Sequence, residues 1–235
     1  MYSNKKTARI AGLLYLVVVL TGMFSLAYVP SQLIVWGNAA QTVSNITGSE
    51  LLFRLGIVSS LICYTFFLFL PIVLYQLLKS VNKTHAKVMV ILAIVSVPIS
   101  FINILNKFAV LSLISSSALL KGAAIAEMQS QVMFYLDLYN SGILIVQIFW
   151  GLWLFPFGYL VYKSGFLPKF LGVLLMAGCF GYLLNFLGNS LLPNYGELGI
   201  SSYVRLPASL GEIGTCLWLL IMGAKEKKID ILKDQ

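Results

Sequence analysis

The stretch LGIVSSLICYTFFLFLPIVLYQLL, from Leu55 to Leu78, contains no charged residue and stands between Arg54 and Lys79. A helix needs about 20 predominantly apolar residues to cross the hydrocarbon core of a bilayer. An uncharged run that exceeds this length, with a basic residue at each end, therefore predicts a transmembrane helix.

Five further long apolar runs occur along the chain, and three of them contain one charged residue each: Lys107, Asp137 and Glu212. The six expected spans are 10–29, 55–78, 88–113, 132–162, 170–192 and 206–224. Several are longer than the minimum, so we expect tilted helices or helix ends that project from the membrane. The sequence thus predicts an all-α integral membrane protein, with residues 1–235 forming a single domain of six transmembrane helices.

Composition supports the same fold class. Hydrophobic residues make up 59% of the 235 positions and charged residues only 10%, whereas soluble domains contain about 25% charged residues. So few charges cannot cover a soluble protein of this size, which excludes a soluble enzyme and a disordered chain. The net charge of +8 does not indicate a nucleic-acid partner, because the basic residues form short clusters between apolar runs, as in membrane proteins.

The distribution of basic residues predicts the orientation, because cytoplasmic loops are enriched in Lys and Arg. With both termini in the cytoplasm, Arg54, Lys107, Lys121 and Arg205 lie outside. The other twelve of the sixteen basic residues then lie inside: Lys5, Lys6, Arg9, Lys79, Lys83, Lys87, Lys163, Lys169, Lys225, Lys227, Lys228 and Lys233. We therefore expect a multi-pass protein of the plasma membrane with both termini cytoplasmic.

The N-terminus allows one alternative. A basic start, an apolar stretch and the small-residue sequence Ser25-Leu26-Ala27 are also the pattern of a cleaved signal peptide. The apolar run is longer than in most signal peptides and reaches Pro30 only after a full span, so we favour an uncleaved first helix. Both alternatives leave the second helix entering from the outside.

Motifs for catalysis or metal binding are missing from the sequence. Cys63, Cys179 and Cys216 fall within expected spans at no metal-ligand spacing, so we expect them to act as small apolar residues. His85 is the sole histidine, and we expect it in a solvated cytoplasmic loop. There is neither an HExxH sequence nor a Gly-rich phosphate loop. We therefore predict no catalytic residue, no metal ion and no cofactor.

Polar residues inside the spans are the remaining candidates for a functional site, because such groups are costly in hydrocarbon. Counting from the cytoplasmic lysine of each span places Glu212 about 20 Å from the inner boundary, and Asn103, Gln147 and Asn185 about 24 Å from it. In a core about 30 Å thick, all four lie in the outer half. The same counting puts four further polar residues at or beyond the outer boundary: Asp137, Asn140, Lys107 and Arg205.

The polar residues of the third to sixth spans recur every three or four positions, so those of one span share a helix face. Because polar faces avoid lipid, we expect these faces to point towards one another. This arrangement predicts a ligand-binding polar pocket in the outer half of the bundle, with Glu212 at its floor. Asp137 is expected at the mouth of the pocket, paired with Lys107 or Arg54.

Two interpretations of this cluster remain open. Amide and hydroxyl side chains commonly join transmembrane helices through hydrogen bonds, and Glu212 could serve the same purpose when protonated or paired with Arg205 or Lys107. Alternatively, Glu212 could exchange a proton during solute movement, or bind a cationic or hydroxylated headgroup together with the three amides.

Three stretches resemble one known family: WGLWLFPFGYLVYKSGFLPKFLG at 150–172, ARIAGLLYL at 8–16 and GEIGTCLWLL at 211–220. They are similar to the bacterial membrane family called domain of unknown function 4386, and the resemblance covers nearly the whole chain. It implies a multi-helix bacterial membrane protein. It implies no activity and no site residues.

From these observations we expect a non-catalytic membrane module, such as a sensor, an accessory factor or a partner-binding subunit. One alternative is a small transporter or carrier of a lipid or amphiphilic solute that uses Glu212; six helices are few for a transporter, so a homodimer is then expected. Another is a lipid-modifying enzyme. We expect the protein to be surrounded by the lipid bilayer and to bind no nucleic acid. The expected ligand is a lipid or a small amphiphile that enters from the outer side. A continuous polar path on the inner side of Glu212 would favour the transporter. A sealed interior would favour the non-catalytic membrane module.

Overall fold

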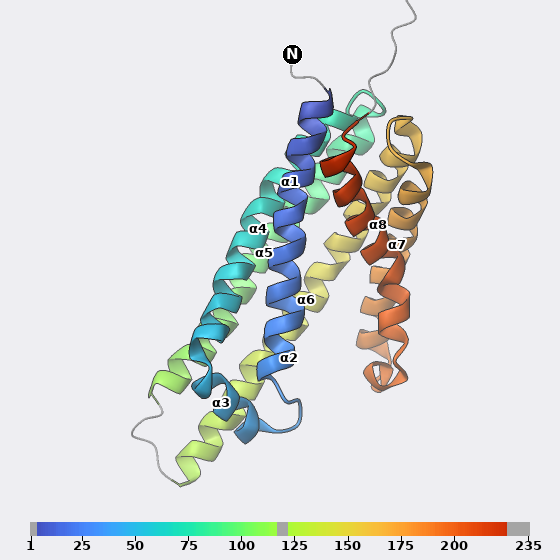
Figure 1. Cartoon of the computed structure of the whole chain (residues 1–235). Coiled ribbons are helices and arrows are strands. Elements are labelled where there is room, and N and C mark those ends of the chain that lie inside the picture. Colours follow the sequence, from blue (N-terminus) through green and yellow to red (C-terminus); the bar gives the residue numbers. More distant parts are fainter. Residues whose placement is uncertain (1–3, 117–121, 225–235) are drawn as a thin grey trace, which may run out of the picture. The chain divides into compact units, whose positions relative to one another are not determined.

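The computed structural model describes residues 4–116 and 122–224, which form helices joined by turns, without strands (Figure 1). Within these ranges six helices are long and apolar enough to cross a membrane: Lys5–Leu33, Glu50–Leu78, Lys83–Ser116, Ala123–Ser164, Lys169–Leu191 and Ile200–Ile221. The prediction of an all-α fold with six apolar spans is confirmed. Some basic residues that carry the predicted orientation lie outside the described residues: Lys121, Lys225, Lys227, Lys228 and Lys233.

The first span is continuous through a change of helix type. It consists of α1 (Asn4–Met23), the π-helix η1 (Phe24–Tyr28) and α2 (Val29–Leu33). Pro30 lies in the first turn of α2, a position where proline is tolerated. The shorter helix α3 (Ala39–Gly48) begins after Asn38, whose side chain accepts a hydrogen bond from the Gln41 backbone N–H at 3.0 Å.

The remaining spans are α4 (Glu50–Leu78), α5 (Lys83–Ser116), α6 (Ala123–Ser164), α7 (Lys169–Leu191) and α8 (Ile200–Ile221), with a 3₁₀ turn, η3 (Tyr195–Leu198), before α8. Several are longer than the predicted runs because helical hydrogen bonding continues through polar residues. With 42 residues, α6 is about 63 Å long, roughly twice the thickness of a hydrocarbon core.

The last span differs from its prediction at both ends. It begins at Ile200 rather than at residue 206, and it ends at Ile221 rather than at residue 224. Gly199 and Gly223 flank it with φ of +65° and +69°. Such left-handed positions are accessible mainly to glycine and commonly stop a helix. The first charged residue after Ile221 is Lys225, which is why hydropathy alone extended the helix to residue 224.

A tight turn joins α6 to α7. The Ser164 hydroxyl donates to the Val161 carbonyl at 2.8 Å and accepts from the Leu167 backbone N–H at 3.3 Å. Gly165 follows with φ of +73°, and Pro168 precedes the first residue of α7. The sequence YKSGFLPK at 162–169 therefore ends one span and starts the next within a few residues.

The expectation for His85 was wrong. This residue lies in the first turn of α5 rather than in a loop, because α5 already begins at Lys83. Its backbone N–H donates to the Asn82 side chain at 3.0 Å, as at a capped helix start. The imidazole is half-buried and stacks on Tyr159, with ring centroids 4.5 Å apart. His85 is thus a packing residue at the beginning of a span.

Close contacts divide the chain into two compact units. Unit 1 consists of Met1–Leu16, Phe69–Ala93 and Trp150–Gln235, and unit 2 of Val17–Leu68 and Ile94–Phe149. Unit 1 contains α7 and α8 whole, and α1, α4, α5 and α6 contribute segments to both units. The predicted polar residues are divided accordingly. Glu212, Asn185 and Arg205 belong to unit 1, and Asn103, Lys107, Asp137, Asn140 and Gln147 belong to unit 2.

Candidate functional site

Glu212 is the acidic residue of unit 1 that lies inside a span, and tyrosines from two other helices hold its carboxyl group. The Tyr15 hydroxyl, on α1, donates to Glu212 Oε1 at 3.0 Å. Tyr182, on α7, is a second hydrogen-bonding neighbour of the same carboxyl group. Glu212 itself is half-buried. One carboxyl group on α8 therefore links α1, α7 and α8.

An aromatic wall fixes the position of Tyr15. Trp153 and Phe157, both on α6, are stacked with ring centroids 5.1 Å apart, and Trp153 packs against Tyr15 at 6.4 Å. All three rings are fully buried. Because a buried aromatic ring cannot change rotamer without displacing its neighbours, the Tyr15 hydroxyl is held in place to donate to Glu212.

Glycines allow α8 to lie very close to α1 and α7, both next to Glu212 and towards the end of α8. A Cβ atom at Gly12 would overlap the backbone of Leu220, and one at Gly211 would lie 3.0 Å from the Leu175 backbone nitrogen. A Cβ at Gly214 would lie 2.7 Å from the side chain of Leu171. Small residues at such positions allow close helix approach in membranes. Helix α8 is therefore tightly packed against α1 and α7 from Gly211 to its end.

Asn185 takes part in a separate set of hydrogen bonds in unit 1. It is only 3% exposed. Its side-chain oxygen accepts from the Ser201 hydroxyl at 2.6 Å, and its backbone carbonyl accepts from the Asn189 side chain at 2.8 Å. Arg205 bonds to the Ser201 carbonyl within its own helix at 3.2 Å. The bond between Ser201 and Asn185 joins α7 to the beginning of α8, and the other two bonds lie within single helices.

In unit 2, Asn103 and Lys107 pack against Tyr139 of α6. The Asn103 side chain donates to the Tyr139 carbonyl at 2.8 Å, and a Cβ at Gly142 would overlap the Asn103 amide, so glycine provides the necessary space. Lys107 is 3% exposed, and its Nζ lies 4.2 Å from the centroid of the Tyr139 ring. This cation–π contact is the interaction that the structure gives to the buried ammonium group.

The expected charge pairs did not form among the described residues. Arg205 makes no salt bridge with Glu212, and Arg54 pairs with Glu50 one turn earlier in α4, with Arg54 Nη2 2.6 Å from Glu50 Oε1. A pair four residues apart on one helix forms without any tertiary contact, which is why it is preferred over a more distant partner. Asp137 has no cationic partner within the described residues.

The other predicted residues of unit 2 differ in burial. Gln147 is buried, whereas Asp137 and Asn140 are exposed. The polar face expected on the fourth span therefore turns inward only in its second half.

Sequence reasoning did not identify Tyr15 and Tyr182 as partners of Glu212. Hydropathy treats tyrosine as largely apolar, and each of the two lies in a run of apolar residues. One signal was available, since a buried tyrosine hydroxyl usually requires a hydrogen-bond partner. Tyr182 lies 13 residues after Lys169, just as Glu212 lies 13 residues before Lys225, so a search for tyrosines at the depth of the acidic residue would have found Tyr182.

Chemically, the arrangement around Glu212 can exchange a proton or accept hydrogen bonds from a ligand. An ionised Glu212 only accepts hydrogen bonds, whereas a protonated one also donates. Among the described residues, no three His, Cys, Asp or Glu side chains are grouped so as to hold a metal ion. Cys63, Cys179 and Cys216 are buried, and the thiols of Cys63 and Cys216 donate to the Val18 and Gly12 carbonyls at 3.4 and 3.6 Å.

Six long apolar helices with polar groups bonded inside them define a multi-pass helical membrane protein. The chain belongs to the family described as Domain of unknown function (DUF4386), whose model matches residues 10–223. The predicted resemblance is thereby confirmed over nearly the whole chain.

One relative of the chain is an uncharacterized protein from Archaeoglobus fulgidus. It is 34% identical over 82 residues, which are 35% of this chain and 46% of the relative. The chain thus spans about half the length of this relative. No solved structure matches the chain.

Proposed function

We propose that this protein is a non-catalytic membrane module, a sensor or partner-binding subunit, in which Glu212 joins three helices and moves no solute. Proton or ligand binding at the carboxyl group changes the hydrogen bonds that reach Tyr15 on α1 and Tyr182 on α7. Occupancy of Glu212 would therefore be communicated to two neighbouring helices of unit 1.

The close packing on the inner side of Glu212 carries this proposal. Between the carboxyl group and the end of α8, Gly12 on α1 meets the backbone of Leu220, and Gly214 on α8 meets the side chain of Leu171. A transport pathway needs a continuous hydrated or polar route there, and backbones in contact leave no width for one. The packing therefore supports a sealed interior.

A flux measurement tests the proposal. Purified wild type and Glu212→Gln are reconstituted into vesicles that contain a pH-sensitive dye, and a potassium diffusion potential is imposed. We expect both proteins to give the proton leak of protein-free vesicles, within about twofold, because no conducting route reaches Glu212. Glu50→Gln, which removes an exposed carboxyl group, is the matched control. A flux in wild type that Glu212→Gln abolishes and Glu50→Gln retains would replace the module with a proton-coupled transporter.

A carrier of lipids or amphiphiles is the second candidate, because Glu212 is half-buried and forms no salt bridge among the described residues. A carboxyl group without a cationic partner has capacity left for a cationic or hydroxylated headgroup. The same vesicles distinguish this candidate when they contain a fluorescent lipid in one leaflet. Transfer of that lipid between leaflets that depends on Glu212 would favour the carrier, for which a homodimer is the proposed assembly.

We further propose that the protein lies in the plasma membrane with both termini in the cytoplasm. Twelve of its sixteen Lys and Arg residues lie on the proposed inner side, and the short α4–α5 and α6–α7 turns are flanked by lysines. Basic residues in short loops are the main determinant of orientation. A reporter fused to the C-terminus should read as cytoplasmic, and an external reading would contradict this orientation.

A further inference from the structure

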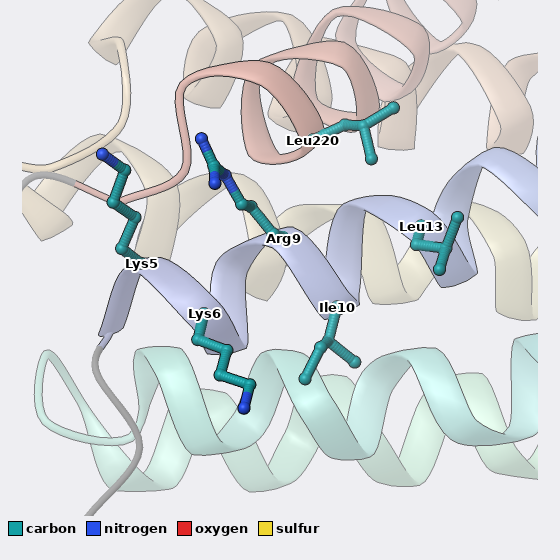
Figure 2. Close-up of a pocket in the computed structure, with 6 residues that line it drawn as sticks. All are labelled: Lys5, Lys6, Arg9, Ile10, Leu13 and Leu220. Atoms are coloured by element: carbon teal, nitrogen blue, oxygen red, sulfur yellow. The ribbon is translucent and has the colours of Figure 1, made fainter.

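A cavity of about 610 Å³ lies against the first turns of α1 and the last turn of α8 (Figure 2). Its volume is within the range of small-molecule sites, about 300–1,000 Å³. Three cationic and three apolar side chains line it: Lys5, Lys6, Arg9, Ile10, Leu13 and Leu220. It belongs entirely to unit 1, and it involves neither Glu212 nor the tyrosines that hold it.

Polarity changes along the length of this cavity. Lys5, Arg9 and Leu13 follow one another at four-residue intervals, so they lie along one side of α1. Figure 2 shows Lys5 and Arg9 extending towards the segment that ends α8, while Lys6 and Ile10 project from the other side of α1. Charge is thus concentrated at the start of the span, and apolar side chains continue deeper into it.

The electrostatics of the cationic end favour an anion. Three cationic side chains line this cavity, and two of them, Lys5 and Arg9, lie one helical turn apart on the same side of α1. The first turn of α1 contains no acidic residue. Positive charge gathered at one end of a cavity attracts an anion.

The apolar end indicates which kind of anion. Ile10 and Leu13 are 42% and 56% exposed, and they lie on a span whose apolar surface faces hydrocarbon. A soluble phosphate would use only the basic end of the cavity. A phospholipid would match both ends, with its headgroup on the cations and its acyl chain along the apolar residues.

We propose that this cavity binds an anionic phospholipid of the surrounding leaflet. Arg9 contacts the headgroup phosphate through its planar guanidinium, which suits phosphate oxygens. Lys5 and Lys6 add positive charge on either side, and Ile10, Leu13 and Leu220 contact the first part of the acyl chain. The site would therefore attach the junction of α1 and α8 to lipids of one charge class.

Lipid titration followed by native mass spectrometry tests the proposal on the full-length protein. The triple variant K5Q/K6Q/R9Q is compared with K79Q/K83Q/K87Q, which removes the same charge from the proposed inner surface outside the cavity. We expect the first variant to lose at least about tenfold in affinity for phosphatidylglycerol, since each basic residue near an anionic surface contributes appreciably. The control should stay within about twofold of wild type, and phosphatidylcholine binding should not change in any variant.

Further measurements distinguish a lipid phosphate from free phosphate and test whether the apolar end of the cavity contacts the acyl chain. Leu13→Trp fills the apolar end without changing charge and should also weaken phosphatidylglycerol binding, while its thermal unfolding stays that of wild type. Equal losses in the two triple variants would overturn the proposal in favour of diffuse attraction. Displacement of the lipid by millimolar inorganic phosphate would overturn the lipid assignment, and unchanged lipid binding by Leu13→Trp would overturn the placement of the acyl chain. The C-terminal reporter verifies that each variant keeps the orientation of wild type.

Discussion

Replacing Gly158 with valine is expected to remove most of the folded protein. Gly158 of α6 and Gly172 of α7 face each other so closely that a Cβ at Gly158 would lie 2.8 Å from the Met176 backbone nitrogen, and one at Gly172 would lie 2.7 Å from the Tyr162 backbone nitrogen. Backbone atoms cannot move aside as a flexible side chain can. Overpacking commonly lowers the free energy of unfolding by about 1–3 kcal/mol. Because the added atoms would meet backbone on both helices, we expect Gly158→Val to cost the upper value of this range or more.

The measurement is the monodisperse yield after detergent extraction, together with the temperature of unfolding. Gly172→Val should have the same effect because it separates the same pair of helices. Gly48→Ala and Gly196→Ala are matched controls, since no neighbouring atom lies within 4 Å of a Cβ at either position. If Gly158→Val unfolded within about 2 °C of wild type, the close α6–α7 contact would be wrong.

This contact also explains which features of the fold were predictable. The six apolar runs identify the spans because the hydrocarbon core imposes a length on each helix. The sequence around Gly158 and Gly172 resembles the family, but hydropathy does not show which glycines face another backbone and which face open space. That distinction depends on helix rotation, and helix rotation is set by the whole set of neighbours.

The polar residues show the same limit. Glu212 could be recognised as an acid inside a span by counting residues, yet the tyrosines that hydrogen-bond to its carboxyl group were not identified. Lys107 was expected at the outer boundary, and it is buried because the ring of Tyr139 covers its ammonium group. Asn103 uses a backbone carbonyl that only the absence of a side chain at Gly142 makes accessible. In each case the partner is a group that hydropathy does not count as polar.

Removal of the Glu212 carboxyl group is expected to weaken the folded state, and to do so through Tyr15. Glu212→Leu leaves the Tyr15 hydroxyl in a fully buried position without its acceptor, and an unsatisfied buried donor costs about 1–3 kcal/mol. Adding Tyr15→Phe to Glu212→Leu removes the unsatisfied donor itself. The double variant should therefore be no less stable than Glu212→Leu alone. Unfolding in a series of sodium dodecyl sulfate concentrations measures the free energy of each variant.

The size of the coupling between the two sites separates a specific bond from general packing. Hydrogen bonds between transmembrane helices contribute about 0.6 kcal/mol on average and up to about 1.7, so a coupling near the upper value is expected for a donor held by Trp153. Glu212→Gln, which keeps a hydrogen-bond acceptor at the same place, is the matched control and should retain nearly all of the stability. Additive losses for Glu212→Leu and Tyr15→Phe would show that the carboxyl group and the hydroxyl act independently. The link from α8 to α1, on which a sensor centred on Glu212 depends, would then be lost.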